Sequence, residues 1–276
     1  MSNKLNIAVI FGGRSGEHEV SLMSARSVLS VLNPEKYNVT QIGITHTGAW
    51  LTGKNVIEAL ESNALDHLTP VVLMPEPREA SLYRVKDNKL EALPKMDVFF
   101  PVLHGTFGED GTLQGLLELA DVAYVGCGVL SSSVGMDKNL FKDVMRSNNV
   151  PVVDSVLANR QDISTSMQAV IEKIESAFPY PVFVKPANLG SSVGISKCSS
   201  RSDLLEGLMD AARFDRRVLV ERGVNAREIE VSVLGNENPA ASVAGEIRPM
   251  DEFYTYEAKY IHDNSELIIP ARIDEP

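Results

Sequence analysis

The sequence predicts an α/β protein in which a parallel-sheet N-terminal domain is followed by an α+β part. Three observations lead to this fold class. A strand, a glycine-rich turn, a helix and a second strand succeed one another over 5–44, as in a parallel crossover unit. Two apolar runs enclose a loop of small residues within 181–197, as in a hairpin. Polar and apolar residues alternate over 227–234 and 240–247, as in antiparallel strands.

Composition narrows the class of protein. The chain has 276 residues, of which 44% are hydrophobic and 23% charged, as in soluble globular proteins of about two domains. Its formal net charge is −11, and it contains no basic run. We therefore expect no nucleic-acid partner and no binding to an anionic membrane. A local positive site can still bind an anionic small molecule.

The two cysteines, Cys127 and Cys198, lie far apart and have no metal-type spacing. They are expected to be free thiols in a reducing compartment. The apolar segment near the N-terminus is too short for a signal peptide, and no run reaches the length of a membrane span. We therefore expect a cytoplasmic protein.

The first domain should begin with a strand over 5–11, a turn over 12–16, a helix over 18–32 and a strand over 38–44. The turn has G-G-x-x-G spacing, which is a weak dinucleotide signal because it is not G-x-G-x-x-G. Glu17 follows the turn directly. An acid there is favoured by the helix dipole. It is also where the ligands of open α/β sheets bind, so both interpretations stay open.

A second polar loop follows the strand expected over 97–103. Residues 45–95 before it should add short strands, at 71–74, 82–85 and 90–93. The loop and the start of the next helix form the motif 104–115, in which His104, Glu109 and Asp110 lie among glycines. Asp110 or Thr112 can cap the helix over 113–120. A cap explains only one acid, so we favour a functional loop.

The middle of the chain is expected to alternate helices with strands. A Gly-Cys-Gly hinge is expected at 126–128, and the elements after it are helices over 130–147, 165–177 and 203–214 and strands over 152–157 and 217–220. Asp137 and Lys138 fall inside the first of these helices, where a lone lysine is usually solvated. Ser202 is expected to cap the third helix.

The hairpin at 181–197 is the segment best suited to an anion. An apolar strand over 182–184 ends in Lys185, and a loop of Gly190, Ser191 and Ser192 precedes a returning strand over 193–196. Backbone N–H groups and hydroxyls can converge on an anion at such a loop, and the lysine adds a point charge. The alternative is an ordinary Gly/Ser hairpin with a surface lysine. The spacing is not that of a Walker loop.

Five motifs stand in the order found in a known family. They are GEHEVS (16–21), HGTFGEDGTLQG (104–115), MDK (136–138), FVKPANLGSSVG (183–194) and FYTYEAKY (253–260). Together they resemble the D-alanine–D-alanine ligases of the ATP-grasp superfamily. The resemblance implies an ATP-grasp fold after the first domain, C-terminally incomplete in this chain. It also implies that ATP turns the carboxylate of one D-alanine into an acyl phosphate, which a second D-alanine attacks to give D-alanyl-D-alanine for peptidoglycan synthesis.

The resemblance also implies the site residues. The ATP site would be formed by Lys138, Lys185, Ser191, Ser192, Glu221, Val224, Glu228 and Lys259. Among them the lysines contact phosphates, Glu221 and the backbone near Val224 bind adenine, and Glu228 binds the ribose. Glu17 would hold the ammonium of the first D-alanine, with a link through Ser191 to Tyr260 on a mobile loop. His104 would lie near the second D-alanine.

The implied domains are an N-terminal substrate domain (1–126), a central ATP-grasp domain (127–225) and the start of a third domain (226–276). In the family the third domain continues and supplies the ligands of two Mg²⁺ (or Mn²⁺) ions. We therefore expect those ligands beyond Pro276, name no metal ligand here, and expect these residues to be part of a longer protein. Enzymes of this family resemble homodimers.

Two alternatives remain from the sequence. One is another ATP-grasp carboxylate–amine ligase, which a substrate panel would distinguish. The other is a nucleotide-binding fragment without turnover, which ATP binding without reaction would favour. Within the family, the intact E-A-K-Y at 257–260 predicts a dipeptide product and not the D-alanine–D-lactate ester.

Overall fold

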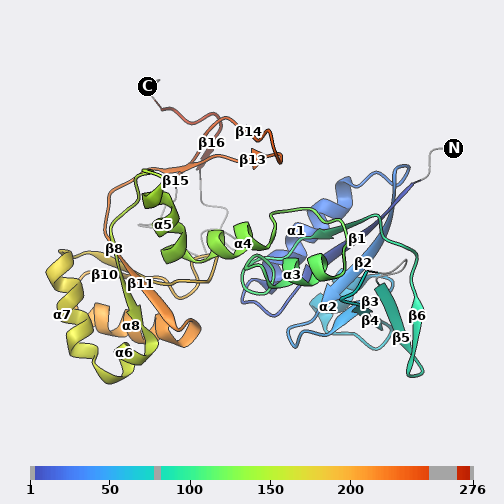
Figure 1. The fold of residues 1–276 in the computed structure, drawn as a ribbon, viewed down its shortest axis with the longest axis horizontal. Helices are drawn as coiled ribbons and strands as arrows, with labels where there is room; N and C mark the ends of the chain where they lie inside the picture. The colour runs from blue at the N-terminus through green and yellow to red at the C-terminus, as the bar shows by residue number, and fades with distance from the viewer. Residues whose placement is uncertain (1–3, 78–81, 249–265, 274–276) are drawn as a thin grey trace. The chain divides into compact units, whose positions relative to one another are not determined.

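The protein separates into two compact units (Figure 1). The structure, a computed structural model, describes residues 4–77, 82–248 and 266–273. Unit 1 comprises Met1–Val152 and Ala187–Gly190, and unit 2 comprises Val153–Pro186 and Ser191–Pro276. The first domain boundary predicted at Gly126 does not coincide with the boundary between these units. The three-domain division therefore stays a prediction.

Unit 1 is built on a seven-stranded mixed sheet in the order β6-β5-β4-β3-β2-β1-β7 (Figure 1). Its strands are β1 (Leu5–Gly12), β2 (Tyr37–Ile44), β3 (Trp50–Thr52), β4 (Thr69–Leu73), β5 (Leu82–Lys86), β6 (Lys89–Ala92) and β7 (Val98–Pro101). The central strand β1 runs parallel to both β2 and β7, which confirms the predicted crossover unit. The strands expected within 45–95 extend the sheet with antiparallel pairs.

Helices cover both faces of this sheet. Those of unit 1 are α1 (His18–Val31), α2 (Val56–Ser62), α3 (Thr112–Leu119), α4 (Val129–Met136) and α5 (Lys138–Ser147). From β1, Val9 and Phe11 pack in a core with residues of α1 and α2, whereas Ala8 and Ile10 pack in a core with residues of α3. Burial on both faces explains why β1 is a continuous apolar run and not an alternating one.

The single helix predicted over 130–147 is wrong. Asp137 has φ −79° and ψ 102°, an extended conformation, and it separates α4 from α5. Its carboxylate accepts hydrogen bonds from the N–H groups of Asn139 (3.1 Å) and Leu140 (2.9 Å), as an N-cap does. Lys138 is thereby placed in the first turn of α5 and not on a helical surface.

Unit 2 contains a four-stranded antiparallel sheet in the order β10-β9-β11-β8. Its strands are β8 (Ser155–Asn159), β9 (Val182–Pro186), β10 (Ser196–Cys198) and β11 (Arg217–Arg222), and the helices of the unit are α6 (Arg160–Thr165), α7 (Met167–Ala177) and α8 (Arg201–Phe214). Val182, Val184 and Val220 pack with apolar residues of these helices. Because side chains alternate along a strand, Lys185 and Glu221 face away from that core.

Two boundaries in unit 2 differ from the sequence prediction. The hairpin is confirmed, but its returning strand begins at Ser196, because the backbone over 191–194 has left-handed residues that cannot continue a strand. Ser200, not Ser202, caps α8, since its Oγ accepts the N–H of Asp203 at 3.2 Å.

The last described part of unit 2 forms two small antiparallel sheets. One contains β12 (Glu228–Glu230), β15 (Gly245–Arg248) and β16 (Glu266–Ile268), and the other contains β13 (Val233–Leu234) and β14 (Ala240–Ala241). The strands predicted over 227–234 and 240–247 are therefore each interrupted. The motif at 253–260 lies outside the described residues.

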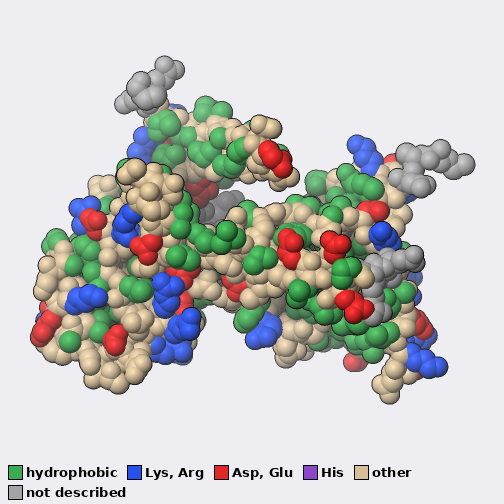
Figure 2. Space-filling view, viewed as in Figure 1, with side chains coloured by type: hydrophobic (Ala, Val, Ile, Leu, Met, Phe, Trp, Pro, Cys, Tyr) green, Lys and Arg blue, Asp and Glu red, His purple; other side chains and the backbone are tan. Residues whose placement is uncertain are grey.

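Acidic and basic side chains are interspersed on the face of each unit seen in Figure 2.

Both cysteines are free thiols, with Cys127 exposed and Cys198 buried. Burial raises the pKa of the Cys198 thiol to about 11. Over the described parts of the chain, no helix has the length and apolarity needed to cross a membrane.

Candidate functional site

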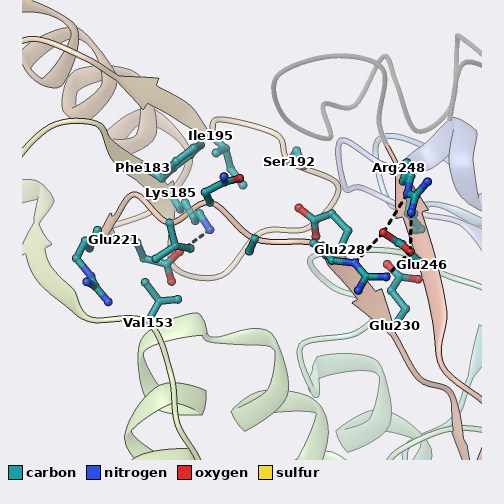
Figure 3. A pocket seen from close by; sticks show the side chains of 16 residues that line it. Val153, Phe183, Lys185, Ser192, Ile195, Glu221, Glu228, Glu230, Glu246 and Arg248 are labelled. Atoms are coloured by element: carbon teal, nitrogen blue, oxygen red, sulfur yellow. Dashed lines mark hydrogen bonds and ion pairs between the residues drawn. The ribbon is translucent and has the colours of Figure 1, made fainter. Parts of the chain in front are cut away.

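A cavity of about 650 Å³ in unit 2 brings together several residues predicted from sequence (Figure 3). Those that line it are Lys185, Ser192, Glu221, Val224 and Glu228. They come from β9, the loop after it, β11 and its following turn, and β12. Residues separated by more than forty positions in the sequence therefore share one concave site, and its volume lies in the usual range for a small-molecule pocket, about 300–1,000 Å³.

Lys185 and Glu221 form an ion pair in this cavity. The Lys185 Nζ lies 2.5 Å from a carboxylate oxygen of Glu221, and the two side chains point toward one another in Figure 3. Only 24% of the lysine side chain and 12% of the glutamate side chain are exposed. The pairing of β9 with β11, which sets Leu219 opposite Lys185, brings both groups to the same face. Each neutralises the charge that the other would otherwise bury.

The loop after β9 has a strained backbone. Ser191 and Ser192 have φ values of 45° and 60°, in the left-handed region that β-carbon-bearing residues rarely adopt. Gly194, at φ 69°, is also required for packing, because a Cβ there would lie 2.7 Å from the Phe214 ring. Strained backbone conformations of this kind are common in loops that bind ligands. Turns in this conformation can also direct backbone N–H groups at an anion.

The turn after β11 places Val224 in the cavity wall. Gly223 N–H donates to the carbonyl of Pro181 at 3.0 Å. A Cβ at Gly223 would lie only 2.4 Å from that same oxygen, so only glycine allows this approach. Val224 beyond it is 46% exposed.

Sequence reasoning missed a charged cluster beside Glu228. Glu246, only 3% exposed, accepts two hydrogen bonds from Arg227 (2.9 and 2.6 Å) and two from Arg248 (3.1 and 3.4 Å) (Figure 3). Hydrogen bonds from Arg227 and then from Arg248 lower the pKa of the Glu246 carboxyl to about 2. The only signal in the sequence was an acid and a base two positions apart on one strand, which is also the pattern of a solvated face.

In unit 1, Glu17, which the family resemblance assigns to the first D-alanine, is buried at the beginning of α1. Its side chain is 3% exposed. Its N–H donates to Ser15 Oγ at 3.0 Å, and Ser15 Oγ in turn donates to the carbonyl of His104 at 2.7 Å. Ser15 therefore ties the turn after β1 to the loop after β7, and it holds Glu17 and His104 in one cluster.

Two glycines make room for the carboxylate of Glu17. A Cβ at Gly105, which has φ 71°, would lie 2.1 Å from Glu17 Oε2. A Cβ at Gly190 would lie 2.7 Å from the same oxygen. Any larger residue at either position would displace the carboxylate, so the acid has a wall formed by backbone.

The carboxyl ends of the parallel strands β1 and β7 meet at this cluster. Ser21 Oγ accepts the N–H of Gly12 at 2.8 Å and donates to the carbonyl of Val102. One α1 turn further, Ser24 Oγ contacts His104 Nε2 at 2.9 Å. Ligands of open α/β sheets bind at this edge, so the position favours the functional interpretation of Glu17 over dipole stabilisation alone.

The two acids of the 104–115 motif have structural partners, but neither Asp110 nor Thr112 caps α3 as predicted, because its N-cap is Gly111 and makes no side-chain cap hydrogen bond. Glu109 Oε2 accepts the N–H of Gly105 at 2.6 Å. Asp110 accepts the N–H groups of Phe107 (2.9 Å) and Thr112 (3.1 Å). Both acids therefore shape the loop that carries His104.

Lys138 is bound within unit 1. Its N–H donates to the carbonyl of Ala187 at 2.9 Å, and its Nζ donates to the carbonyl of Leu189. Lys138 thus supports the first part of the 187–195 loop. It does not line the cavity of unit 2, so its contact with phosphate stays a prediction.

Other predicted residues are not brought together by the described structure. Tyr260 and Lys259 lie outside the described residues, and Glu17 and Ser191 belong to different units. The link from Glu17 through Ser191 to Tyr260 therefore stays a prediction. Within 4–77, 82–248 and 266–273, no group of three or more His, Cys, Asp or Glu residues is placed to hold a metal ion.

Solved structures share this fold. The VanG D-Ala:D-Ser ligase from Enterococcus faecalis matches with a TM-score of 0.82 and 36% identity, over 99% of this chain and 78% of that one. The D-alanine-D-alanine ligase from Coxiella burnetii matches with a TM-score of 0.75 and 35% identity, over 88% and 71%. The fold is that of the ATP-grasp ligases.

Sequence comparison identifies the family. The models of the D-ala D-ala ligase N-terminus and C-terminus match residues 6–127 and 144–276. The D-alanine--D-alanine ligase of Heliobacterium modesticaldum is 49% identical over 98% of this chain and 74% of its own length, and that of Caldicellulosiruptor bescii is 48% identical over the same shares. The chain belongs to the D-alanine–D-alanine ligase family.

Proposed function

We propose that the protein joins two D-alanines into D-alanyl-D-alanine, through an acyl phosphate made with ATP, for peptidoglycan synthesis. The observation that carries the proposal is the cavity of unit 2. Five residues chosen from sequence as nucleotide contacts line it together. Family membership supports the same reaction.

The unit 2 cavity supports a nucleotide as its ligand. Lys185 supplies a cation for a phosphate, and the loop of Ser191 and Ser192 supplies hydroxyl and N–H donors around it. Glu221 and the backbone near Val224 bind adenine, while Glu228 binds the ribose hydroxyls. The Lys185–Glu221 ion pair neutralises both buried charges, and each partner can also contact a different end of the nucleotide.

The unit 1 cluster supports a small amino acid. Glu17 binds the ammonium of the first D-alanine, since a buried carboxylate attracts a cation strongly. The close approach of Gly105 and Gly190 leaves little space beside it, which suits a methyl side chain. His104, held by Ser24, lies near the second D-alanine.

Two bond exchanges complete the reaction. A carboxylate oxygen of the first D-alanine attacks the terminal phosphorus of ATP, and ADP leaves. The neutral amine of the second D-alanine then attacks the acyl carbon, a proton leaves the nitrogen, and inorganic phosphate departs with the oxygen that bridged carbon and phosphorus. The residues orient the reactants and stabilise phosphate charge. Ser191 and Tyr260 close the site over the intermediate, and Lys138 and Lys259 add phosphate contacts.

Family membership implies a divalent metal with the nucleotide, and two Mg²⁺ (or Mn²⁺) ions are our proposal. Bound to the phosphates, such ions would neutralise the charge that develops during transfer. None of the described residues forms a cluster suited to hold them. We assign the metal ligands to no described residue.

We further infer a cytoplasmic homodimer. Two free thiols support a reducing compartment, and the family resemblance supports the dimer. Light scattering of the purified protein should give twice the mass of one chain, and a monomer mass across the working concentration range would contradict it.

A substrate panel tests the proposed reaction. The purified protein that carries this sequence is incubated with ATP, Mg²⁺ and D-alanine, L-alanine, or D-alanine together with D-serine or D-lactate. We expect ADP release with D-alanine, D-alanyl-D-alanine as the product by mass, and little D-alanyl-D-lactate at neutral pH. ADP release only with another carboxylate would favour a different ATP-grasp ligase. ATP binding without D-alanine-dependent turnover would favour a nucleotide-binding module.

A further inference from the structure

The charged cluster of Arg227, Glu246 and Arg248 forms a double fork. Each guanidinium uses its Nε and Nη2 against the two oxygens of Glu246, so one carboxylate is held on both sides. Such paired contacts fix orientation as well as distance. Arg227 Nη2 also donates to the carbonyl of Arg272 at 2.8 Å, which holds its guanidinium at a third point.

The fork is adjacent in the chain to the proposed ribose contact. Arg227 immediately precedes Glu228, and Glu228 pairs with Ile247, the residue between Glu246 and Arg248. The side-chain fork and the backbone pairing therefore fix the same short segment of β12 against β15. Glu228 is otherwise an exposed residue at the beginning of a three-residue strand, which on its own would be a poorly fixed position.

The simpler role for these residues would be to hold the strands β12 and β15 together. However, all three members of the fork line the cavity, together with Glu228. The two cations are matched by Glu246 and by Glu266, which lies 3.7 Å from Arg248, so the contribution of the fork beside Glu228 is its geometry and not a net charge. The fork therefore lies where it can orient Glu228 within the cavity.

We propose that Glu246 is a positioning residue for nucleotide recognition, which holds Arg227 so that Glu228 meets the ribose hydroxyls. The inference rests on the proposed nucleotide site. It assigns Glu246 no contact with the reacting atoms. Its effect is confined to the recognition of the sugar.

The test compares the affinity for ATP with that for 2′,3′-dideoxy-ATP, which lacks both ribose hydroxyls. We expect the wild-type protein to prefer ATP by about ten-fold or more, the usual effect of hydrogen bonds to a charged group. Glu246→Gln should reduce this preference to within about two-fold, because the neutral amide cannot hold both guanidiniums. Glu228→Gln should do the same, and the double variant should lose no more than either alone.

Two further variants separate positioning from folding. Glu175→Gln removes the ion pair to Arg201 at 2.5 Å, which is similar in length to the Arg227–Glu246 pair at 2.6 Å. Glu175 lies in the same unit but outside the cavity, so this variant should keep the full preference for ATP. Arg227→Lys keeps the charge but loses the fork geometry, and should lose the preference while the protein stays folded by circular dichroism.

The inference is overturned if Glu246→Gln and Arg227→Lys lower the melting temperature but keep the wild-type ratio of the two affinities. A wild-type protein that binds both nucleotides equally would also overturn it, because no ribose recognition would exist to be positioned. A wild-type protein that binds no ATP would instead overturn the proposed function, so the two failures are distinguishable.

Discussion

Glu17, Glu221 and Glu246 are buried carboxylates with different surroundings. Their residues are 3%, 9% and 3% exposed. Glu246 lies between two guanidiniums, Glu221 faces one ammonium, and Glu17 lies against two glycines. A buried carboxylate needs a compensating charge or donors. Glu246 therefore serves to hold the two arginines, whereas ligand contacts of Glu221 and Glu17 belong to the proposed function.

The lowered pKa of Glu246 predicts a pH dependence of stability. Its pKa falls from 4.5 to about 2 on folding, so the contribution of the charged fork is fully present above pH 4.5 and is lost as the pH falls toward 2. Urea unfolding of the wild type and of Glu246→Gln should differ most at pH 6, and the difference should shrink through that window. A difference that stayed constant from pH 6 to pH 3 would contradict the assignment.

Substitution of Glu17 should affect D-alanine and not ATP. Glu17→Gln removes the charge that would bind the ammonium, so KM for D-alanine should rise about ten- to hundred-fold. The affinity for ATP should stay unchanged, since Glu17 does not line the nucleotide cavity.

The matched control is Glu19→Gln, two residues further along α1. The Glu19 side chain is 64% exposed and faces His46, so this change should leave both ligands unaffected. Equal loss of D-alanine and ATP binding in Glu17→Gln would point to a folding defect and contradict the assignment.

At the scale of elements, the loop after β7 positions the cluster of Ser15, Glu17 and His104 in unit 1. Its own acids fold back on its N–H groups, and its glycines let it approach Glu17. Such a loop is positioned by a rigid sheet but carries the polar groups, as functional loops generally do.

One substitution within this element should displace Glu17 directly. Gly105→Ala places a Cβ 2.1 Å from Glu17 Oε2 at a backbone φ of 71°. We expect KM for D-alanine to rise at least about ten-fold, with a stability loss of about 1–3 kcal/mol from the strained conformation. Kinetics and urea unfolding measure the two effects.

Gly115 offers a control in the same motif. It lies inside α3, and a Cβ there would meet nothing within 4 Å. Gly115→Ala should therefore leave KM unchanged and stabilise the helix by about 0.5–1 kcal/mol. An unchanged KM in Gly105→Ala would show that the glycine wall does not shape the D-alanine site.

Sequence patterns predicted the elements whose periodicity is local. The apolar run of β1, the crossover to β2 and the hairpin of β9 and β10 were all recognisable. The break at Asp137 was not, because an aspartate in the extended conformation of a cap looks like an ordinary residue of a polar helix face. Strand ends near Ser191 also shifted, since left-handed serines carry no sequence signal comparable to glycine.

The candidate site was predicted in part for the same reason. Lys185 was indicated by the hairpin pattern and Glu228 by the family resemblance, and the structure places both at one cavity. The Lys185–Glu221 pair depends on strand register, which no local pattern specifies. Glu246 was missed because Arg227 lies 19 positions away, just before β12, and because the alternation of Glu246 and Arg248 on β15 looks solvent-exposed.

At the scale of the whole molecule, we propose that the two units bind different substrates. Unit 1 carries the groups suited to an amino acid, and unit 2 carries the cavity suited to a nucleotide. An acyl-phosphate mechanism needs both ligands, because a carboxylate oxygen of the amino acid attacks the terminal phosphorus of the nucleotide. The proposed activity is therefore a transfer between substrates, and not the binding of either one alone.

The most direct measurement of that transfer follows oxygen. The protein is incubated with ATP, Mg²⁺ and D-alanine carrying ¹⁸O in its carboxylate, and the inorganic phosphate is analysed by mass. We expect one ¹⁸O in each phosphate released with the dipeptide, because the oxygen that attacks phosphorus departs with it. Dipeptide accompanied by unlabelled phosphate would contradict the acyl-phosphate mechanism.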